Sequence, residues 1–262
     1  MRIVRAEIML LLLLLQGSVH AVAAGDDHPS PSGGVPQQNC TFYNGYLAGD
    51  IDLLVRGIAE QERRYRASGS SDDLYVLIVS RYGYIGYLLS VDNNREARRV
   101  LDAARENLEV LQGDDAFRAR ATAMEGALTA MRIALNPLRA TYLGRRSMRL
   151  MEEALTINSS EPVAWVEMGN GRYHAPRLAG GSKEEAVRCF TEAVRLFETD
   201  ERLLKCNWHY LHALVWLAKS HEATGDLHSA KETYEKLLSI EPQFMWVKQE
   251  LYPELLKRMS EQ

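Results

Sequence analysis

The chain has 262 residues, of which 46% are hydrophobic and 25% are charged, and its formal net charge is −4. This composition excludes a disordered tail, a collagen-like chain and a multi-span membrane protein. The slightly acidic balance predicts no general attraction to nucleic acid or to an anionic membrane.

The N-terminal segment has the three parts of a secretory signal peptide. Arg2 and Arg5 form a basic region, an apolar run extends over 8–15, and small residues follow at 21–24. The apolar run is too short to cross a bilayer of about 30 Å as a stable helix. We therefore expect residues 1–23 to be a signal peptide, with cleavage after Ala23 or Ala24 left open. The mature protein is expected to be exported, periplasmic or secreted, without a transmembrane anchor.

Residues 24–39 are rich in Pro, Ser and Gly, which predicts a flexible linker. From residue 40 to residue 262 the hydrophobic spacing is helical almost throughout, and Gly, Asn and Pro interrupt it. This pattern predicts one all-α domain. The predicted helices lie near 50–67, 74–90, 94–112, 115–135, 145–157, 162–173, 182–197, 203–224, 227–239 and 243–258.

Residues 211–244 carry the most regular pattern. Ala218 and Ala230 are twelve residues apart, Tyr234 follows four residues later, and Pro242 closes the unit. The small residues let two antiparallel helices touch, the aromatic ring fills the gap between neighbouring pairs, and the proline ends the second helix. This spacing resembles the 34-residue tetratricopeptide repeat (TPR).

Three further copies of this pattern precede it. The copy at 162–197 places Gly169 and Ala186 seventeen residues apart, and more degenerate copies lie around 126–154 and 82–111. Four copies in tandem predict a TPR-like α-solenoid of antiparallel helix pairs. Two of the turns between paired helices hold extra residues, which predicts insertions that protrude side by side from one edge.

The C-terminal stretch 243–258 has apolar residues at three- and four-residue steps. A solenoid exposes an apolar face at its last repeat unless another element covers it. We therefore predict a capping helix that docks on the helix of Ala230 and Tyr234. Pro253 lacks a backbone donor, so an interruption near Tyr252 is expected.

The stretches 82–89, 133–148, 164–190 and 241–257 look like one family of secreted bacterial TPR proteins. That family has no assigned activity, so the resemblance implies an architecture and no chemistry. The turn that contains Pro176, Gly180 and Gly181 is also similar to TPR lipoproteins that partner periplasmic TRAP-type solute transporters. This chain departs from those lipoproteins because it lacks a lipobox cysteine.

Motifs for catalysis are absent from the sequence: it holds no phosphate-binding loop, dinucleotide fingerprint, nucleophile elbow or zinc-protease motif. We therefore predict a non-enzymatic protein with no catalytic residue, no cofactor and no metal site. Cys206, His209 and His212 are spaced three apart, but the outer two would lie about 9 Å apart along a helix, so packing is favoured over a metal site. Of the three cysteines, Cys189 and Cys206 lie on successive predicted helices. Their pairing stays open, with core packing favoured.

Two basic stretches coincide with the predicted inserted turns. Residues 136–149 hold four Arg, residues 170–183 hold two Arg and one Lys, and neither stretch holds an acid. Aromatic and imidazole rings lie between the basic residues. This pattern predicts an edge that binds an anion or a partner, with positive helix caps and solvated turns as the alternative. The candidate residues are Arg139, Tyr142, Arg145, Arg146, Arg172, Tyr173, His174 and Arg177.

The sequence therefore predicts an exported TPR scaffold that binds a protein or peptide partner in the cell envelope. The alternative is a subunit of a periplasmic TRAP-type transporter that binds a small organic anion. That alternative predicts an enclosed pocket beneath the two inserted turns. No nucleic-acid partner is expected.

Overall fold

The computed structural model describes residues 39–261, and within this range the chain forms helices and turns without a β-strand. The predicted signal peptide and residues 24–38 of the predicted linker lie outside the described residues. The α-helices of the described range are α1 (Cys40–Ala48), α2 (Ile51–Ser68), α3 (Ser71–Ser90), α4 (Asn94–Leu111), α5 (Arg118–Leu135), α6 (Ala140–Ile157), α7 (Pro162–His174), α8 (Lys183–Phe197), α9 (Trp208–Thr224), α10 (Leu227–Ile240) and α11 (Tyr252–Ser260).

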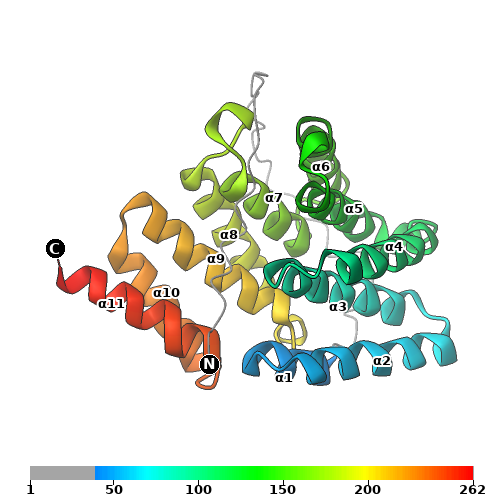
Figure 1. Ribbon diagram of the computed structural model, residues 1–262, viewed down its shortest axis with the longest axis horizontal. Coiled ribbons are helices and arrows are strands. Elements are labelled where there is room, and N and C mark those ends of the chain that lie inside the picture. Colours follow the sequence, from blue (N-terminus) through cyan, green and yellow to red (C-terminus); the bar gives the residue numbers. More distant parts are fainter. Residues whose placement is uncertain (1–38, 262) are drawn as a thin grey trace.

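The helices pack in adjacent pairs along the chain (Figure 1), with extensive contacts between α3 and α4, α5 and α6, α7 and α8, and α9 and α10, and α8 packs to a similar extent on α9. The first helices of successive pairs also touch: α5 contacts both α3 and α7, and α7 contacts α9. This arrangement confirms the predicted all-α solenoid of helix pairs. None of the described helices is long and apolar enough to span a membrane.

Small residues allow the paired helices to approach closely. A Cβ atom added to Gly169 of α7 would lie 2.8 Å from Cε1 of Phe190 on α8. In the preceding pair, the Ser147 hydroxyl on α6 donates a hydrogen bond of 2.8 Å to the carbonyl of Gly126 on α5. Tyr234 is fully buried between neighbouring pairs. These contacts occur at the positions that the repeat pattern predicted.

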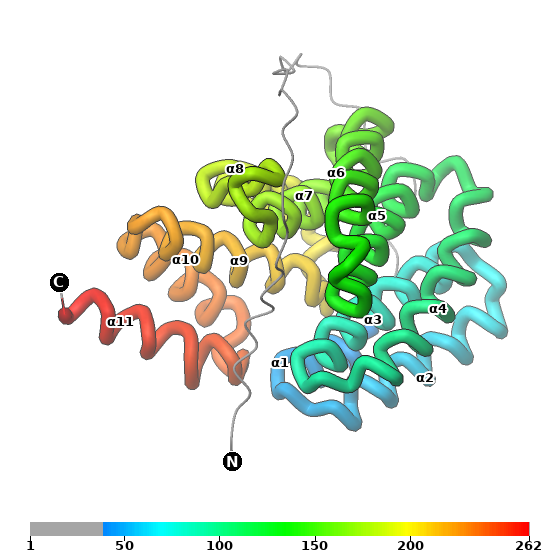
Figure 2. The backbone as a smooth tube through the Cα atoms, turned by 45° about the horizontal axis from the view of Figure 1, so that its top comes forward, coloured from blue at the N-terminus to red at the C-terminus, as the bar shows by residue number. Residues whose placement is uncertain are grey.

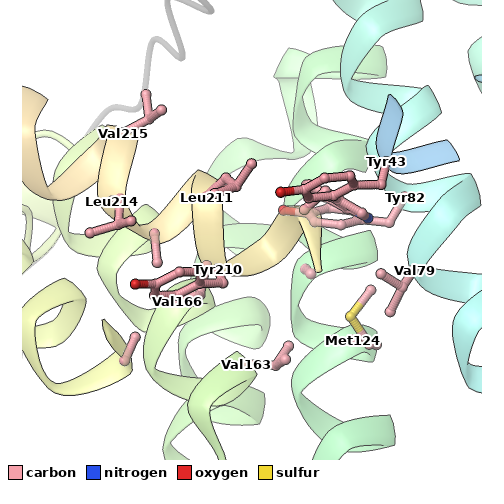
Figure 3. Packing of buried hydrophobic residues seen from close by; sticks show 14 of the residues in the cluster. Tyr43, Val79, Tyr82, Met124, Val163, Val166, Tyr210, Leu211, Leu214 and Val215 are labelled. Atoms are coloured by element: carbon pink, nitrogen blue, oxygen red, sulfur yellow. The ribbon is translucent and has the colours of Figure 1, made fainter. Parts of the chain in front are cut away.

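Side chains from the first helices of the pairs share one hydrophobic core. Tyr82 of α3, Met124 of α5, Val166 of α7 and Leu211 of α9 are all buried in the same cluster (Figure 3). The core therefore runs through the solenoid and fixes the positions of α7 and α9.

The extra residues between α5 and α6 mostly lengthen α6, whereas those between α7 and α8 form a turn. Helix α6 begins at Ala140, where the sequence predicted 145, and only the short 3₁₀ turn η2 (Pro137–Arg139) separates it from α5. Helix α7 continues to His174, and the 3₁₀ turn η3 (Arg177–Ala179) precedes α8. The predicted turn between the helices 115–135 and 145–157 is therefore too long, because Pro137 interrupts the helix for only a few residues.

The predicted helix 203–224 is divided. A 3₁₀ turn, η4 (Glu201–Leu203), is followed by Cys206 in the left-handed region with φ of 52°. Helix α9 then starts at Trp208, where the side chain of Asn207 accepts the backbone N–H of His209. The sequence also missed α1, whose nine residues directly follow the predicted linker.

A disulfide between Cys40 and Cys206 joins α1 to the turn before α9, across a sequence separation of 166 residues. Cys189 is a buried free thiol. The Cys189–Cys206 pairing that the sequence left open is therefore excluded, and the partner of Cys206 is the cysteine at the edge of the predicted linker.

Non-covalent contacts also hold α1 against the C-terminal part of the chain. The Tyr43 hydroxyl donates a hydrogen bond of 2.6 Å to Glu241, which follows α10. The ring centroid of Tyr46 lies 5.2 Å from that of Phe244. Helix α1, at the N-terminal end of the described helices (Figure 2), therefore also contacts the C-terminal part of the chain and links the two ends of the solenoid.

The C-terminal segment docks on α10 as predicted. The Tyr252 hydroxyl donates to Glu235 of α10 at 2.8 Å, and the rings of Tyr252 and Tyr234 lie 6.5 Å apart. The predicted interruption takes the form of a π-helical turn, η5 (Val247–Leu251), directly before α11 and Pro253. The apolar stripe is buried over Phe244, Val247, Leu251 and Leu255.

Candidate functional site

A polar cluster lies inside the core where α3, α7 and α9 meet. Glu167 is 1% exposed, and its Oε2 accepts hydrogen bonds from the Tyr82 hydroxyl at 2.9 Å and from the Asn170 side chain at 3.1 Å. Nε2 of His209 lies 3.7 Å from Oε1 of Glu167. Burial raises the pKa of Glu167 to about 7, and burial lowers the pKa of His209 well below its usual value.

Several polar atoms of this cluster have no hydrogen-bond partner in the described part of the chain. A cavity of about 20 Å³, which matches one water molecule, borders His209, Arg120 and Glu161. Burial favours the neutral forms of both Glu167 and His209, so the pair does not carry two opposite charges at neutral pH. The unpartnered atoms are Tyr46 Oη, Glu167 Oε1, Asn170 Oδ1, Trp208 Nε1, His209 Nε2 and His212 Nε2.

Aromatic rings continue from this cluster toward solvent along α7 and α9. The ring centroid of Trp216 lies 4.6 Å from that of His174, 4.9 Å from that of Tyr173 and 5.9 Å from that of His212. All four side chains are partly exposed. We call this region the inner aromatic surface; it consists of Asn170, Tyr173, His174, Lys183, His212, Trp216 and Lys219.

The inner aromatic surface is positively charged. The Lys183 ammonium lies 3.4 Å from the Tyr173 ring centroid, and the Lys219 ammonium lies 5.7 Å from that of Trp216. Neither lysine forms an ion pair within residues 39–261. Burial and then the two lysines lower the pKa of His174 to about 4. Burial and then His174 lower the pKa of His212 to about 3, so both imidazoles are neutral at pH 7.

The structure divides the eight residues of the predicted basic edge. Tyr173 and His174 belong to the inner aromatic surface. Arg172 donates a hydrogen bond of 2.9 Å to the carbonyl of Gly180, and Arg146 forms an ion pair of 2.6 Å with Glu125. The remaining four are exposed on α6, η2 and η3 and form no ion pair in the described range: Arg139, Tyr142, Arg145 and Arg177.

Sequence reasoning missed the contribution of α9 to the inner aromatic surface. His212, Trp216 and Lys219 recur at steps of four and three residues, which places them on one face of a helix. The spacing of Cys206, His209 and His212, which first suggests a metal site, lies on the same predicted helical stretch. Cys206 is in the disulfide, His209 faces Glu167, and the residues that the structure describes contain no group of three or more metal-ligating side chains.

The transporter-subunit alternative receives no support from the cavities. It requires an enclosed pocket beneath the turns η2 and η3. Two cavities stand out among the described residues: an open depression beside Asn93, Arg95, Glu96 and Arg99 at the start of α4, and the cavity of about 20 Å³ in the core. Neither lies beneath those turns, and the second is too small for an organic anion.

Comparisons with known proteins agree with this architecture. The tetratricopeptide repeat family model matches residues 211–244. The crystal structure of TTC0263, a thermophilic TPR protein of Thermus thermophilus, is similar with a TM-score of 0.55 and 16% identity, over 82% of this chain and 95% of that chain. The HusA haemophore of Porphyromonas gingivalis is similar with a TM-score of 0.55 and 18% identity, over 71% of this chain and 94% of that chain. No curated protein matches the sequence.

These likenesses concern the fold, since both identities are below 20%. Proteins built from TPR helix pairs are generally non-catalytic, and the fold suggests a scaffold for protein interactions. Residues 211–244 therefore match a tetratricopeptide repeat, and the described part of the chain has the fold of a TPR solenoid.

Proposed function

We propose that this protein is an exported scaffold that binds a segment of a partner protein on its inner aromatic surface, in the cell envelope. The observation that carries the proposal is the combination of rings and charge on α7 and α9. Trp216 offers an apolar face and Lys219 an ammonium group. Lys183 adds positive charge on the Tyr173 ring and donates a hydrogen bond to the Tyr173 carbonyl, and no carboxylate forms an ion pair with either lysine in the described range.

This chemistry selects the class of partner. Aromatic side chains dominate protein interfaces because they bury a large rigid area, and a lysine at the rim favours partners of opposite charge. We therefore propose a partner segment with an apolar or aromatic side chain that packs on Trp216. An acidic residue beside it would reach Lys219.

Two features support export. The N-terminal sequence has the pattern of a signal peptide, and disulfides persist mainly in oxidising compartments such as the bacterial periplasm. The Cys40–Cys206 disulfide fits such a compartment. The test is fractionation of cells that produce the full chain, with maleimide labelling of thiols before any reductant is added. Export predicts a shortened protein outside the cytoplasm with one reactive thiol after unfolding; an uncleaved cytoplasmic protein with three reactive thiols would reject it.

Binding is tested by affinity capture from envelope extracts of the producing cells. Immobilised wild-type protein is compared with Trp216→Ala and Lys219→Gln, and Lys205→Gln serves as the control because that lysine is exposed in the turn before α9. We expect a defined partner whose affinity falls at least about tenfold in the first two variants and not in the control. Equal capture by all four proteins would remove the inner aromatic surface from the proposal.

A planar anionic ligand is a second candidate occupant of the same surface. The structurally similar HusA is named a haemophore, and the inner aromatic surface combines ring faces and ammonium groups with the neutral imidazoles of His174 and His212. Such groups suit a tetrapyrrole that carries carboxylates. Titration with haemin, followed by its absorption band, tests this candidate. Saturable binding that Trp216→Ala weakens supports it, and a linear, non-saturable response rejects it.

A further inference from the structure

A second surface stands out at the turns η2 and η3. Each turn begins at or directly after a proline and contains a leucine next to an arginine. These residues are Leu138 and Arg139 in η2, and Leu178 and Arg177 in η3. Leu138 is 99% exposed, and Leu178 is 57% exposed. We define the edge patch as Leu138, Arg139, Tyr142, Arg145, Arg177 and Leu178.

Packing of α6 on α7 brings the two turns to the same edge of the solenoid. A Cβ atom added to Gly171, near the end of α7, would lie 2.7 Å from Sδ of Met148 on α6. The two helices run antiparallel from the short connection at 158–161, so the start of α6 lies beside the end of α7. Turn η2 directly precedes α6 and turn η3 follows α7, and both turns therefore project from one edge.

Basic side chains dominate this edge. Arg139, Arg145 and Arg177 form no ion pair within the described residues. The carboxylates near these arginines include Glu125, which forms an ion pair with Arg146, and Asp102, which attracts Arg132. Glu184, in the first turn of α8, accepts a hydrogen bond from the Ser182 hydroxyl and attracts Arg177. Arginines also repel one another here, since burial and then three neighbouring arginines lower the pKa of Arg132 on α5; these neighbours are Arg105, Arg146 and Arg139.

We propose that the edge patch docks this protein on an anionic lipid bilayer. Leu138 and Leu178 enter the boundary between headgroups and acyl chains, and the three exposed arginines bind lipid phosphates. Tyr142, which is 63% exposed, takes the interfacial position that amphipathic aromatic rings favour.

A membrane fits these observations better than a second protein does. Anchor residues at protein interfaces insert into pockets of the partner, whereas a fully exposed leucine at the tip of a convex turn enters a fluid headgroup layer without a preformed pocket. The net charge of −4 opposes general membrane adsorption, so attraction depends on the local concentration of arginines. This docking does not depend on ligand binding at the inner aromatic surface.

The test is flotation of the purified disulfide-bonded protein with vesicles of phosphatidylcholine, with and without phosphatidylglycerol. We expect binding only to the anionic vesicles. Because each basic residue strengthens such binding roughly fivefold, the triple variant Arg139→Gln/Arg145→Gln/Arg177→Gln should bind at least about 50-fold more weakly. The double variant Leu138→Ser/Leu178→Ser should lose at least about tenfold.

Control variants separate docking from a change in total charge or hydrophobicity. The triple variant Arg56→Gln/Arg63→Gln/Arg95→Gln removes three exposed arginines on α2 and α4, and Val110→Ser removes an exposed apolar side chain from α4. Both should bind as wild type does. Equal losses in patch and control variants would overturn the proposal, as would the absence of vesicle binding. If vesicle binding falls in the arginine variant alone, the insertion of the leucines is overturned. If vesicles do not bind but a protein ligand requires the edge patch, the proposal is overturned and the patch is a protein interface.

Discussion

Removal of the Cys40–Cys206 disulfide should destabilise the protein strongly. The crosslink spans 166 residues, and a loop of that length restricts the unfolded chain by about 5 kcal/mol of free energy at 25 °C. For a chain of this size, each kcal/mol shifts Tm by about 2–4 °C, so Cys40→Ser should lower Tm by about 10–20 °C. Reduction of the wild-type protein should have the same effect.

The backbone at Cys206 refines this prediction. Its φ of 52° lies in the left-handed region, which costs a residue with a side chain about 1–2 kcal/mol and costs glycine little. Both Cys206→Ala and Cys206→Gly abolish the crosslink, yet the glycine variant should melt about 2–8 °C higher than the alanine variant.

Calorimetry with and without dithiothreitol measures these shifts, and thiol titration in denaturant measures the crosslink. Cys189→Ala is the control, because this free thiol is buried away from the disulfide and its variant should keep the full response to reductant. The reasoning is refuted if reductant leaves the Tm of wild type unchanged, or if three thiols react in the unfolded, unreduced protein.

Three further predictions follow from the core and the ends of the solenoid. Unfolding free energy should fall between pH 7 and pH 5. His174, His209 and His212 have depressed pKa values because they are buried, so the unfolded state takes up protons in this range while the folded state does not. Glu167, with its pKa raised to about 7, offsets about 2 kcal/mol of this loss because it takes up a proton in the fold. Glu167→Gln removes that compensation, so its loss should exceed that of wild type by about 2 kcal/mol; denaturant titrations that give parallel pH curves for the two proteins would contradict this coupling. Gly169→Val should lower the free energy of unfolding by about 2–3 kcal/mol, because α7 and α8 touch at this glycine. Gly86→Ala should raise it by about 0.5–1 kcal/mol in the same assay, because the added Cβ meets only a side-chain carbon at 3.8 Å. Truncation at Pro242 should expose the apolar face that the C-terminal segment covers, so the truncated protein should aggregate or melt at a lower temperature. A truncated protein that is monomeric by light scattering and has an unchanged melting temperature by circular dichroism would show that this segment is no cap.

The solenoid was predictable from the sequence because its determinants are local. The small residues and the aromatic residue of each repeat recur at fixed steps, and the contacts between Gly169 and Phe190 or between Gly126 and Ser147 follow directly from those steps. Helix lengths were less predictable. A proline such as Pro137 predicts a break in the helix but does not determine how many residues the break contains.

Closure of the solenoid by α1 was not predictable in the same way. The partners of α1 lie far away in the sequence, as Tyr43 and Glu241 illustrate, so no local spacing specifies them. The same limit applies to Cys206, whose partner is set by tertiary packing. Neighbours in sequence also differ in their surroundings. Arg145 and Arg146 were both predicted on the basic edge, but Arg146 forms an ion pair with Glu125 on α5, whereas Arg145 is exposed.

Site-specific photo-crosslinking tests the central claim, binding of a partner segment on the inner aromatic surface, most directly. Benzoyl-phenylalanine replaces Trp216 in one variant and the 63% exposed Val110 of α4 in the other, and both are irradiated in intact producing cells. The account predicts one defined protein adduct at position 216, absent at position 110 and weakened when Lys219→Gln is added. No adduct at position 216, or the same adducts at both positions, would contradict it.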